Sequence, residues 1–186
     1  MAKLVYSAIT SLDGYVADED GNFDWSTPDP ELFSFINDIE RHFGTNLYGR
    51  RMYDTMVWWE TFDASGDQPP YMRDFTMLWR AANKIVYSRT LTVASSARTR
   101  IEATFDADAV RRMKASSEHD ISIGGANLAS QAFEAGLVDE MHLFATPVTV
   151  GGGTPAHPAH FRSNLELVHL DRFASGVVHL HYLVKR

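Results

Sequence analysis

The stretch Ile121-Ser122-Ile123-Gly124-Gly125-Ala126-Asn127-Leu128 joins an apolar run, two glycines and residues that favour a helix. This pattern predicts a buried strand over 120–123 and a helix over 126–135. Glycine lets the backbone approach a ligand closely, and a helix start presents free N–H groups and the positive end of its dipole. A phosphate or pyrophosphate fits there, and a tight strand-to-helix turn without any ligand fits equally well.

Two further predicted strand ends carry residues that suit an anion. Gly49, Arg50 and Arg51 follow a short strand over 46–48, and a helix is predicted over 50–55. Two cations in the first turn oppose the helix dipole, and a bound anion would offset that cost. The simpler alternative is one solvated arginine and one surface ion pair.

Ser88 and Arg89 follow a predicted strand over 84–87, and a hydroxyl beside a guanidinium suits a phosphate monoester such as the 2′-phosphate of NADP. Ligands of α/β sheets bind outside the carboxyl ends of the strands, so three such strand ends together predict one anion site. The sequence contains neither G-x-G-x-x-G nor G-x-x-x-x-G-K-[ST], which excludes the Rossmann and P-loop fingerprints.

Strands and helices alternate along most of the chain, with further strands predicted over 3–10 and 141–146 and helices over 30–42, 73–82 and 106–115. This alternation predicts an α/β fold around a mixed, mostly parallel sheet. Two strands over 165–173 and 177–184 predict an antiparallel hairpin at the C-terminus. The length of 186 residues and the lack of a linker predict a single domain over residues 1–186.

Other parts of the chain mark helix ends and loops. Asp29 is predicted to cap the helix that follows it, and Gly44 is predicted to stop that helix. The acidic segment 11–28 is expected to be a functional loop or a lid, and 58–71 is expected to be irregular. Gly151-Gly152-Gly153 predicts a flexible turn.

Composition excludes several classes of protein. The net charge is −7, which argues against a nucleic-acid binder, and the absence of cysteine excludes disulfides, thiolate nucleophiles and cysteine-held metal clusters. The N-terminal apolar run is too short and too polar for a signal peptide or a membrane span, so a cytoplasmic protein is expected. The lack of G-x-S-x-G leaves a serine hydrolase without support.

Four of the eight histidines occur as two pairs, and each pair could bind a metal. His157 and His160 flank a Pro-Ala dipeptide, while His179 and His181 alternate on the last predicted strand. Without a third ligand at a recognisable spacing, surface histidines are the favoured interpretation, and no metal site is predicted.

The order of these motifs resembles the dihydrofolate reductase-like superfamily. Within it the chain is most similar to the reductase (C-terminal) domain of the bifunctional deaminase-reductase of bacterial riboflavin biosynthesis. The motifs that carry the resemblance are Ser11–Gly14, Gly49–Arg51, Ser88-Arg89, Gly124–Leu128, Glu134–Glu140 and Pro147 with Gly151–Gly153. The resemblance implies a three-layer α/β/α fold, NADPH as the hydride donor and a homodimer. The cysteine-free chain does not include the zinc deaminase domain of the bifunctional enzyme.

The resemblance also implies cofactor-binding positions. Gly49, Arg50 and Arg51 match the turn that holds the cofactor phosphates, and Ser88 with Arg89 matches the loop at the 2′-phosphate. The pyrophosphate turn is matched by Gly124, Gly125, Ala126, Asn127 and Leu128. Positions near the nicotinamide are matched by Ile9, Val16 and Ala17.

On the substrate side the resemblance implies an acidic residue early in the first helix. Glu31 is the nearest match and Asp29 the second, although both also make a good helix start. Thr146 matches a threonine that supports the acid. Asp13 could contact substrate, although a role in forming the turn is favoured.

These features predict an NADPH-dependent reductase that passes a hydride to a small, flat heterocycle or to a carbonyl or imine substrate, of pterin or pyrimidine type. Two alternatives stay open. One is a non-catalytic NADP(H)- or nucleotide-binding protein of the same fold, and the other is a variant that binds a flavin.

Overall fold

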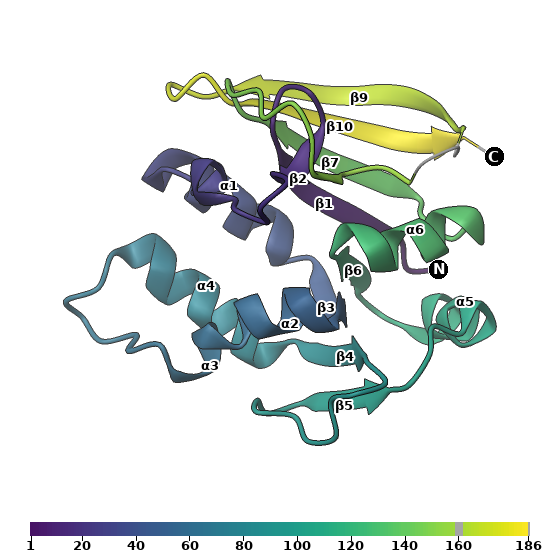
Figure 1. Ribbon diagram of the computed structural model, residues 1–186. Helices are drawn as coiled ribbons and strands as arrows, with labels where there is room; N and C mark the ends of the chain where they lie inside the picture. The colour runs from purple at the N-terminus through teal and green to yellow at the C-terminus, as the bar shows by residue number, and fades with distance from the viewer. Residues whose placement is uncertain (159–161, 186) are drawn as a thin grey trace.

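An eight-stranded sheet forms the centre of the computed structural model, which describes residues 1–158 and 162–185 (Figure 1). The strand order is β5-β4-β3-β6-β1-β7-β10-β9. The strands are β1 (Leu4–Thr10), β3 (Phe43–Gly49), β4 (Asn83–Tyr87), β5 (Thr99–Glu102), β6 (Asp120–Gly124), β7 (Glu140–Ala145), β9 (Asn164–Arg172) and β10 (Val178–Lys185). A separate small sheet pairs β2 (Tyr15–Ala17) with β8 (Thr154–Pro155).

Strand directions confirm the predicted mixed sheet. The six strands from β5 to β7 run parallel to their neighbours, whereas β10 pairs antiparallel with β7 and β9 pairs antiparallel with β10. The C-terminal hairpin is therefore present, with a bulge between His181 and Tyr182. Because the six parallel strands point the same way, their carboxyl ends share one edge of the sheet.

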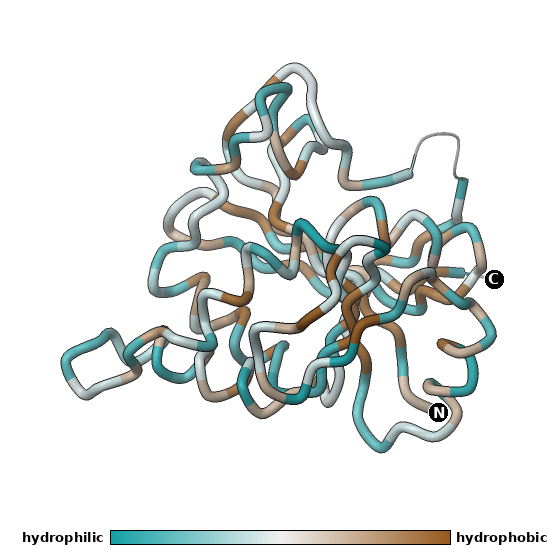
Figure 2. Tube along the Cα trace, turned by 60° about the horizontal axis from the view of Figure 1, so that its bottom comes forward, coloured by the Kyte–Doolittle hydropathy of each residue, from teal (hydrophilic) through white to brown (hydrophobic). Residues whose placement is uncertain are grey.

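Helices cover both faces of the sheet (Figure 1). They are α1 (Pro30–Glu40), α2 (Arg50–Met56), α3 (Trp58–Thr61), α4 (Pro70–Ala81), α5 (Ala107–Ser116) and α6 (Ala126–Glu134), with a 3₁₀ turn at Asp24–Ser26. α1 and α4 pack together on one face, while α5 and α6 lie on the other. The result is the predicted three-layer arrangement, and apolar residues concentrate along its middle (Figure 2).

The two faces of the sheet carry separate hydrophobic cores. Alternate residues of the parallel strands, such as Tyr6 and Ile123, pack against Phe133 of α6 on one face. On the opposite face, Phe144 of β7 packs against Leu32 of α1. Alternation along each strand therefore explains why both layers of helices stay attached.

Several predicted element ends differ from the structure. Gly44 does not stop the first helix, because α1 ends at Glu40 and Gly44 lies inside β3, whose first residue Phe43 is buried. β5 was not predicted. The segment 58–71 is not wholly irregular, since it contains α3 and the start of α4. Pro70 occupies the first turn of α4, where a missing N–H costs nothing, so the proline pair begins a helix instead of breaking one.

The predicted N-cap at Asp29 is confirmed. Asp29 accepts a hydrogen bond from the N–H of Leu32 at 2.8 Å at the start of α1. Gly136 follows α6 with φ of +63°, the left-handed conformation that glycine adopts at little cost. In the described ranges 1–158 and 162–185, no helix has the length and apolar character needed to cross a membrane.

Candidate functional site

The three strand ends singled out in the sequence lie side by side. In the sheet register Tyr48 pairs with Gly124, and Gly49 pairs with Tyr87. The residues that follow β3, β4 and β6 therefore leave the same edge next to one another. The structure thus brings the Gly49, Ser88 and Gly124 turns together.

The glycine pair sits in a crowded turn. Gly125 has φ of +93°, a conformation that other L-residues rarely adopt. A Cβ atom on Gly124 would lie 3.1 Å from Cδ1 of Tyr48 and 3.3 Å from Cγ of Met52, and one on Gly125 would lie 3.4 Å from Cβ of Met52. Glycine is therefore needed here for the packing of β6 against α2 as well as for any ligand.

Helix α6 begins directly after this turn, and its N-cap residue Gly125 supplies no side-chain hydrogen bond. The first N–H groups of a helix have no acceptor inside the helix. α6 therefore offers uncapped N–H groups beside the turn at Gly49, whose own Cβ position is 3.7 Å from Cβ of Leu128. An anion would satisfy these groups.

The arginines at this edge differ in their partners. Arg50 Nε lies 2.9 and 2.7 Å from the two carboxylate oxygens of Asp54 on its own helix. Arg51 and Arg89 are exposed, and neither makes an ion pair within residues 1–158 and 162–185. The simpler alternative, one surface ion pair and one solvated arginine, therefore describes Arg50 and Arg51 as they stand. No carboxylate among the described residues neutralises the charge of Arg51 or of Arg89.

The Ser88 side chain stabilises the loop that follows β4. Its Oγ accepts hydrogen bonds from the N–H groups of Thr90 (3.2 Å) and Leu91 (3.0 Å), and its residue is buried. The Ser88 hydroxyl also lies 3.5 Å from Oγ1 of Thr90, and either of these two hydroxyls can be the donor. Ser88 thus fixes the loop that carries Arg89.

The residues assigned to the nicotinamide side lie on β1 and β2. Ile9 is half-buried and packs with the core under α1, and Val16 and Ala17 belong to β2. β2 pairs with β8, so the segment predicted to be a lid is tied to the loop that contains Gly153. A Cβ on Gly153 would lie 2.1 Å from the carbonyl oxygen of Ala17, and the triple-glycine turn is therefore tightly packed against β2.

Asp13 ties the same two loops together. Its carboxylate accepts hydrogen bonds from the N–H groups of Val150 (3.2 Å) and Gly151 (2.7 Å). Hydrogen bonds from Ser11 and Gly151 lower the pKa of Asp13. These contacts match the turn-forming role that the sequence favours for this residue.

Glu31, the residue matched to the catalytic acid, does not contact Thr146, the residue matched to its support. Glu31 is exposed, and its Oε2 accepts from the N–H of Ala174 at 3.2 Å, in the turn of the C-terminal hairpin. Thr146 is buried, and its hydroxyl donates to the carbonyl oxygen of Thr10 at 2.9 Å. Both residues lie near the carboxyl edge, but the expected support of Glu31 by Thr146 is not formed. Asp29 is engaged in capping α1.

Two open hollows lie at the opposite edge. One of about 730 Å³ is bounded by the amino ends of β3, β4 and β5 and by α5, and Arg98, Arg100 and Arg112 line it. The other, of about 370 Å³, lies beside Lys3 and Glu140. Neither contains a predicted cofactor residue. Because parallel α/β sheets bind ligands at the carboxyl ends of their strands, we place the candidate site at the other edge despite these hollows.

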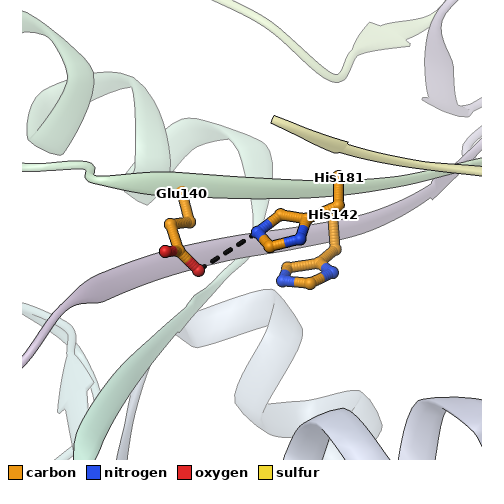
Figure 3. A group of neighbouring side chains, drawn as sticks. All are labelled: Glu140, His142 and His181. Atoms are coloured by element: carbon orange, nitrogen blue, oxygen red, sulfur yellow. Dashed lines mark hydrogen bonds and ion pairs between the residues drawn. The ribbon is translucent and has the colours of Figure 1, made fainter. Parts of the chain in front are cut away.

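The histidines of the last strand were predicted to be surface residues. That prediction is wrong for His179, which is 2% exposed. His181 lies with Glu140 and His142 of β7 on one face of the sheet (Figure 3). His179 lies on the same face, with its Nε2 2.9 Å from Nδ1 of His142. Burial lowers the pKa of His179, and burial with the neighbouring His181 and His179 lowers that of His142 to about 3. His160, of the other pair, lies outside the described residues.

Sequence reasoning missed Glu140 and His142. Both lie on β7 with one residue between them, the same alternation that His179 and His181 show on β10. Pairing of β7 with β10 then puts all four side chains on one face, because register partners in a sheet share a face. The alternation of these residues is visible in the sequence, but it indicates a cluster only once the pairing of β7 with β10 is known.

Comparison with known proteins agrees with the fold. The family model of the RibD C-terminal domain matches residues 2–179. The uncharacterized protein YyaP of Bacillus subtilis (strain 168) is 30% identical over 184 residues, which is 97% of this chain and 94% of that protein.

Solved structures show the same architecture. A protein from Shewanella sp. PV-4, provisionally assigned to riboflavin biosynthesis, is 23% identical with a TM-score of 0.76, and the match covers 100% of both chains. Dihydrofolate reductase from Enterococcus faecalis, complexed with NADP(H), is 15% identical with a TM-score of 0.66 over 99% of this chain and 97% of that one. The predicted dihydrofolate reductase-like fold is confirmed. With the family model matching nearly the whole chain, this protein belongs to the RibD C-terminal domain family.

Proposed function

We propose that this protein is an NADPH-dependent reductase. Its substrate is a small, flat compound with a polarised C=N or C=O group, of pterin or pyrimidine type. The observation that carries the proposal is the meeting of the Gly49, Ser88 and Gly124 turns at the ends of three adjacent strands. Membership of the RibD C-terminal domain family and the likeness to a dihydrofolate reductase complexed with NADP(H) support a reductase.

The residues at this edge fit the phosphates of the cofactor. Gly124 and Gly125 add no side chain of their own to this turn, and α6 supplies uncapped N–H groups for the pyrophosphate. Arg89 and the hydroxyl of Ser88 would hold the 2′-phosphate, and Arg51 would face the other phosphates. NADPH, when bound, supplies the hydride.

The protein's own contribution to the reaction is positioning. β1 with Ile9 provides a fixed apolar wall beside which a flat ring can lie, and the β2–β8 pair covers the end of β1. A proton must reach the reduced substrate, and Glu31 or a bound water molecule would deliver it. Glu31 can donate this proton only if its hydrogen bond to the N–H of Ala174 breaks or is shared with the substrate.

A second candidate function is a nucleotide-binding protein without turnover. It is favoured by one observation, that Glu31 is exposed and is bonded to the hairpin turn instead of to Thr146. A third candidate is a flavin in place of NADPH, bound by the same phosphate turns. A yellow purified protein would indicate the flavin at once.

Binding and turnover measured on the same sample separate these candidates. NADPH is titrated into the purified full chain, and its oxidation is then followed at 340 nm with pterin, pyrimidine and quinone-like substrates. The proposed reductase binds NADPH and oxidises it with at least one of them. Binding without turnover on any substrate would favour the second candidate, and absence of binding would refute the cofactor assignment.

We also propose that the protein acts as a cytoplasmic homodimer. β9 is an edge strand of the sheet, and its apolar side chains are 41–53% exposed: Leu165, Leu167, Val168 and Leu170. An exposed apolar edge supports pairing with a second copy. Light scattering should report a dimer that Leu170→Glu dissociates, while Met77→Glu, at an exposed position on α4, leaves the mass unchanged. A monomeric wild type would refute the dimer.

A further inference from the structure

We propose that Glu140, His142 and His181 form a binding site for a divalent transition-metal ion such as Zn²⁺. Each residue offers one ligand atom, and these three atoms lie within 4.8 Å of one another (Figure 3). Ligands at 2.0–2.2 Å from a tetrahedral ion lie about 3.4 Å apart, so small side-chain movements bring the three atoms onto one ion. Two imidazoles and one carboxylate are a ligand set that Zn²⁺ accepts.

The sheet itself holds the three side chains on one face. Glu140 and His142 alternate on β7, and His142 is the direct cross-strand partner of His181 on β10. Side chains at such positions stand about 5 Å apart at Cβ. The imidazole rings of His142 and His181 are stacked with centroids 4.2 Å apart. The ligands thus come from rigid strands, where a site is held more firmly than on loops.

A chain of hydrogen bonds orients His142. Asp171 Oδ2 lies 2.9 Å from Nδ1 of His179, and Nε2 of His179 lies 2.9 Å from Nδ1 of His142. An ionised carboxylate only accepts, so Nδ1 of His179 donates to Asp171 and its Nε2 accepts. His142 must then donate from Nδ1, which leaves its Nε2 with a free lone pair. That tautomer is the one a metal requires.

This chain is the arrangement that supports metal-binding histidines in general, in which the second ring nitrogen donates to a carboxylate or another acceptor. His142 and His179 are both buried, at 8% and 2% exposure, so the orientation is fixed by packing as well. The hydrogen-bond chain from partly exposed Asp171 through His179 to His142 is a second observation, separate from the ligand cluster, that points to the same ion.

Glu140 already has two partners. Its Oε2 lies 3.1 Å from Nε2 of His181, and its Oε1 lies 2.5 Å from Nζ of Lys3. An ion would enter between Oε2 and His181 and replace that hydrogen bond, while Lys3, whose side chain is 53% exposed, can stay on Oε1 or turn to solvent. Three protein ligands leave a fourth position for water.

The site is independent of the proposed reductase activity. His142 pairs in the register with Ser7 and Glu140 with Val5, both before the carboxyl end of β1 at Thr10. The ion would join β7 to β10 and so fasten the C-terminal hairpin to the parallel part of the sheet. Failure of the metal assignment would therefore leave NADPH binding unaffected.

Metal titration of the full chain tests the assignment. The chelator-treated protein is titrated with Zn²⁺ by calorimetry and with Co²⁺ by visible absorption. One ion per chain and the intense bands of tetrahedral Co²⁺ are expected. His181→Gln should weaken Zn²⁺ binding by at least about 100-fold, and Asp171→Asn, which loosens only the relay, by about 10- to 100-fold.

His169→Gln is the matched control, because His169 lies on the neighbouring strand and bonds to Asp171 but is not one of the three ligands. It should bind Zn²⁺ within about threefold of the wild type. Circular dichroism of each metal-free variant checks that it is folded. If His181→Gln does not fold, the Co²⁺ spectrum of the wild-type protein tests the site on its own. Binding that is not stoichiometric, Co²⁺ bands of the hydrated ion, or equal losses in His181→Gln and His169→Gln would overturn the site.

Discussion

Replacing Arg89 by alanine tests the proposed 2′-phosphate contact. Arg89 is exposed and makes no ion pair in the part of the chain that the structure describes, so its removal should change the free energy of unfolding by less than about 0.5 kcal/mol. A hydrogen bond between a charged donor and a phosphate contributes about 1.5–3 kcal/mol, which corresponds to about 10- to 150-fold in Kd. Because solvent and salt screen an exposed guanidinium, the lower end, about tenfold, is expected at 0.15 M salt.

The assay is a fluorescence titration with NADPH and with NADH. Only NADPH carries the 2′-phosphate, so Arg89→Ala should weaken NADPH about tenfold and NADH by less than about twofold. Arg112→Ala is the control, since Arg112 is also exposed but lies at the opposite edge of the sheet. Equal losses for the two nucleotides in Arg89→Ala, or an NADPH-specific loss in Arg112→Ala, would remove Arg89 from this role.

Three further predictions concern the acid, the glycine turn and the buried histidines. Glu31→Gln should lower kcat by about 10²-fold or more, and an unchanged kcat would show that Glu31 is not the proton donor. Gly125→Ala forces a side chain into φ of +93° beside Met52, so urea denaturation should show a loss of about 1–2 kcal/mol, and an unchanged midpoint would contradict this. The pKa of His142 is lowered from 6.5 to about 3 by burial and by its histidine neighbours, so its contribution to stability is complete above pH 6.5 and declines as the pH falls towards 3. His142→Gln should reduce this loss between pH 6.5 and 5 without abolishing it, because burial also lowers the pKa of His179, and the same pH dependence in both metal-free proteins would refute it.

Local sequence signals predicted the sheet and most helices. Short apolar runs of strand-forming residues predicted the parallel strands, and the cap at Asp29 depends on residues close together in the chain. β5 was missed because it is a four-residue edge strand whose sequence, Thr99 to Glu102, is mostly polar. The helix predicted over 73–82 begins three residues earlier, at Pro70, because proline stops a helix in its interior but is tolerated in its first turn.

The site was predictable only where it depends on strand ends. Parallel strands place their carboxyl ends together, so the Gly49, Ser88 and Gly124 turns could be combined without knowing the strand order. The partners of Glu31 and the burial of His179 depend on which hairpin and which helix pack nearby. These are long-range contacts, and no local pattern around either residue specifies them.

A structure of the full chain with NADPH tests the central claim most directly. The account predicts the pyrophosphate against the turn at Gly124 and Gly125 and the start of α6, with the 2′-phosphate at Ser88 and Arg89. NADPH bound instead in the open hollow lined by Arg98 and Arg112, at the opposite edge of the sheet, would contradict it.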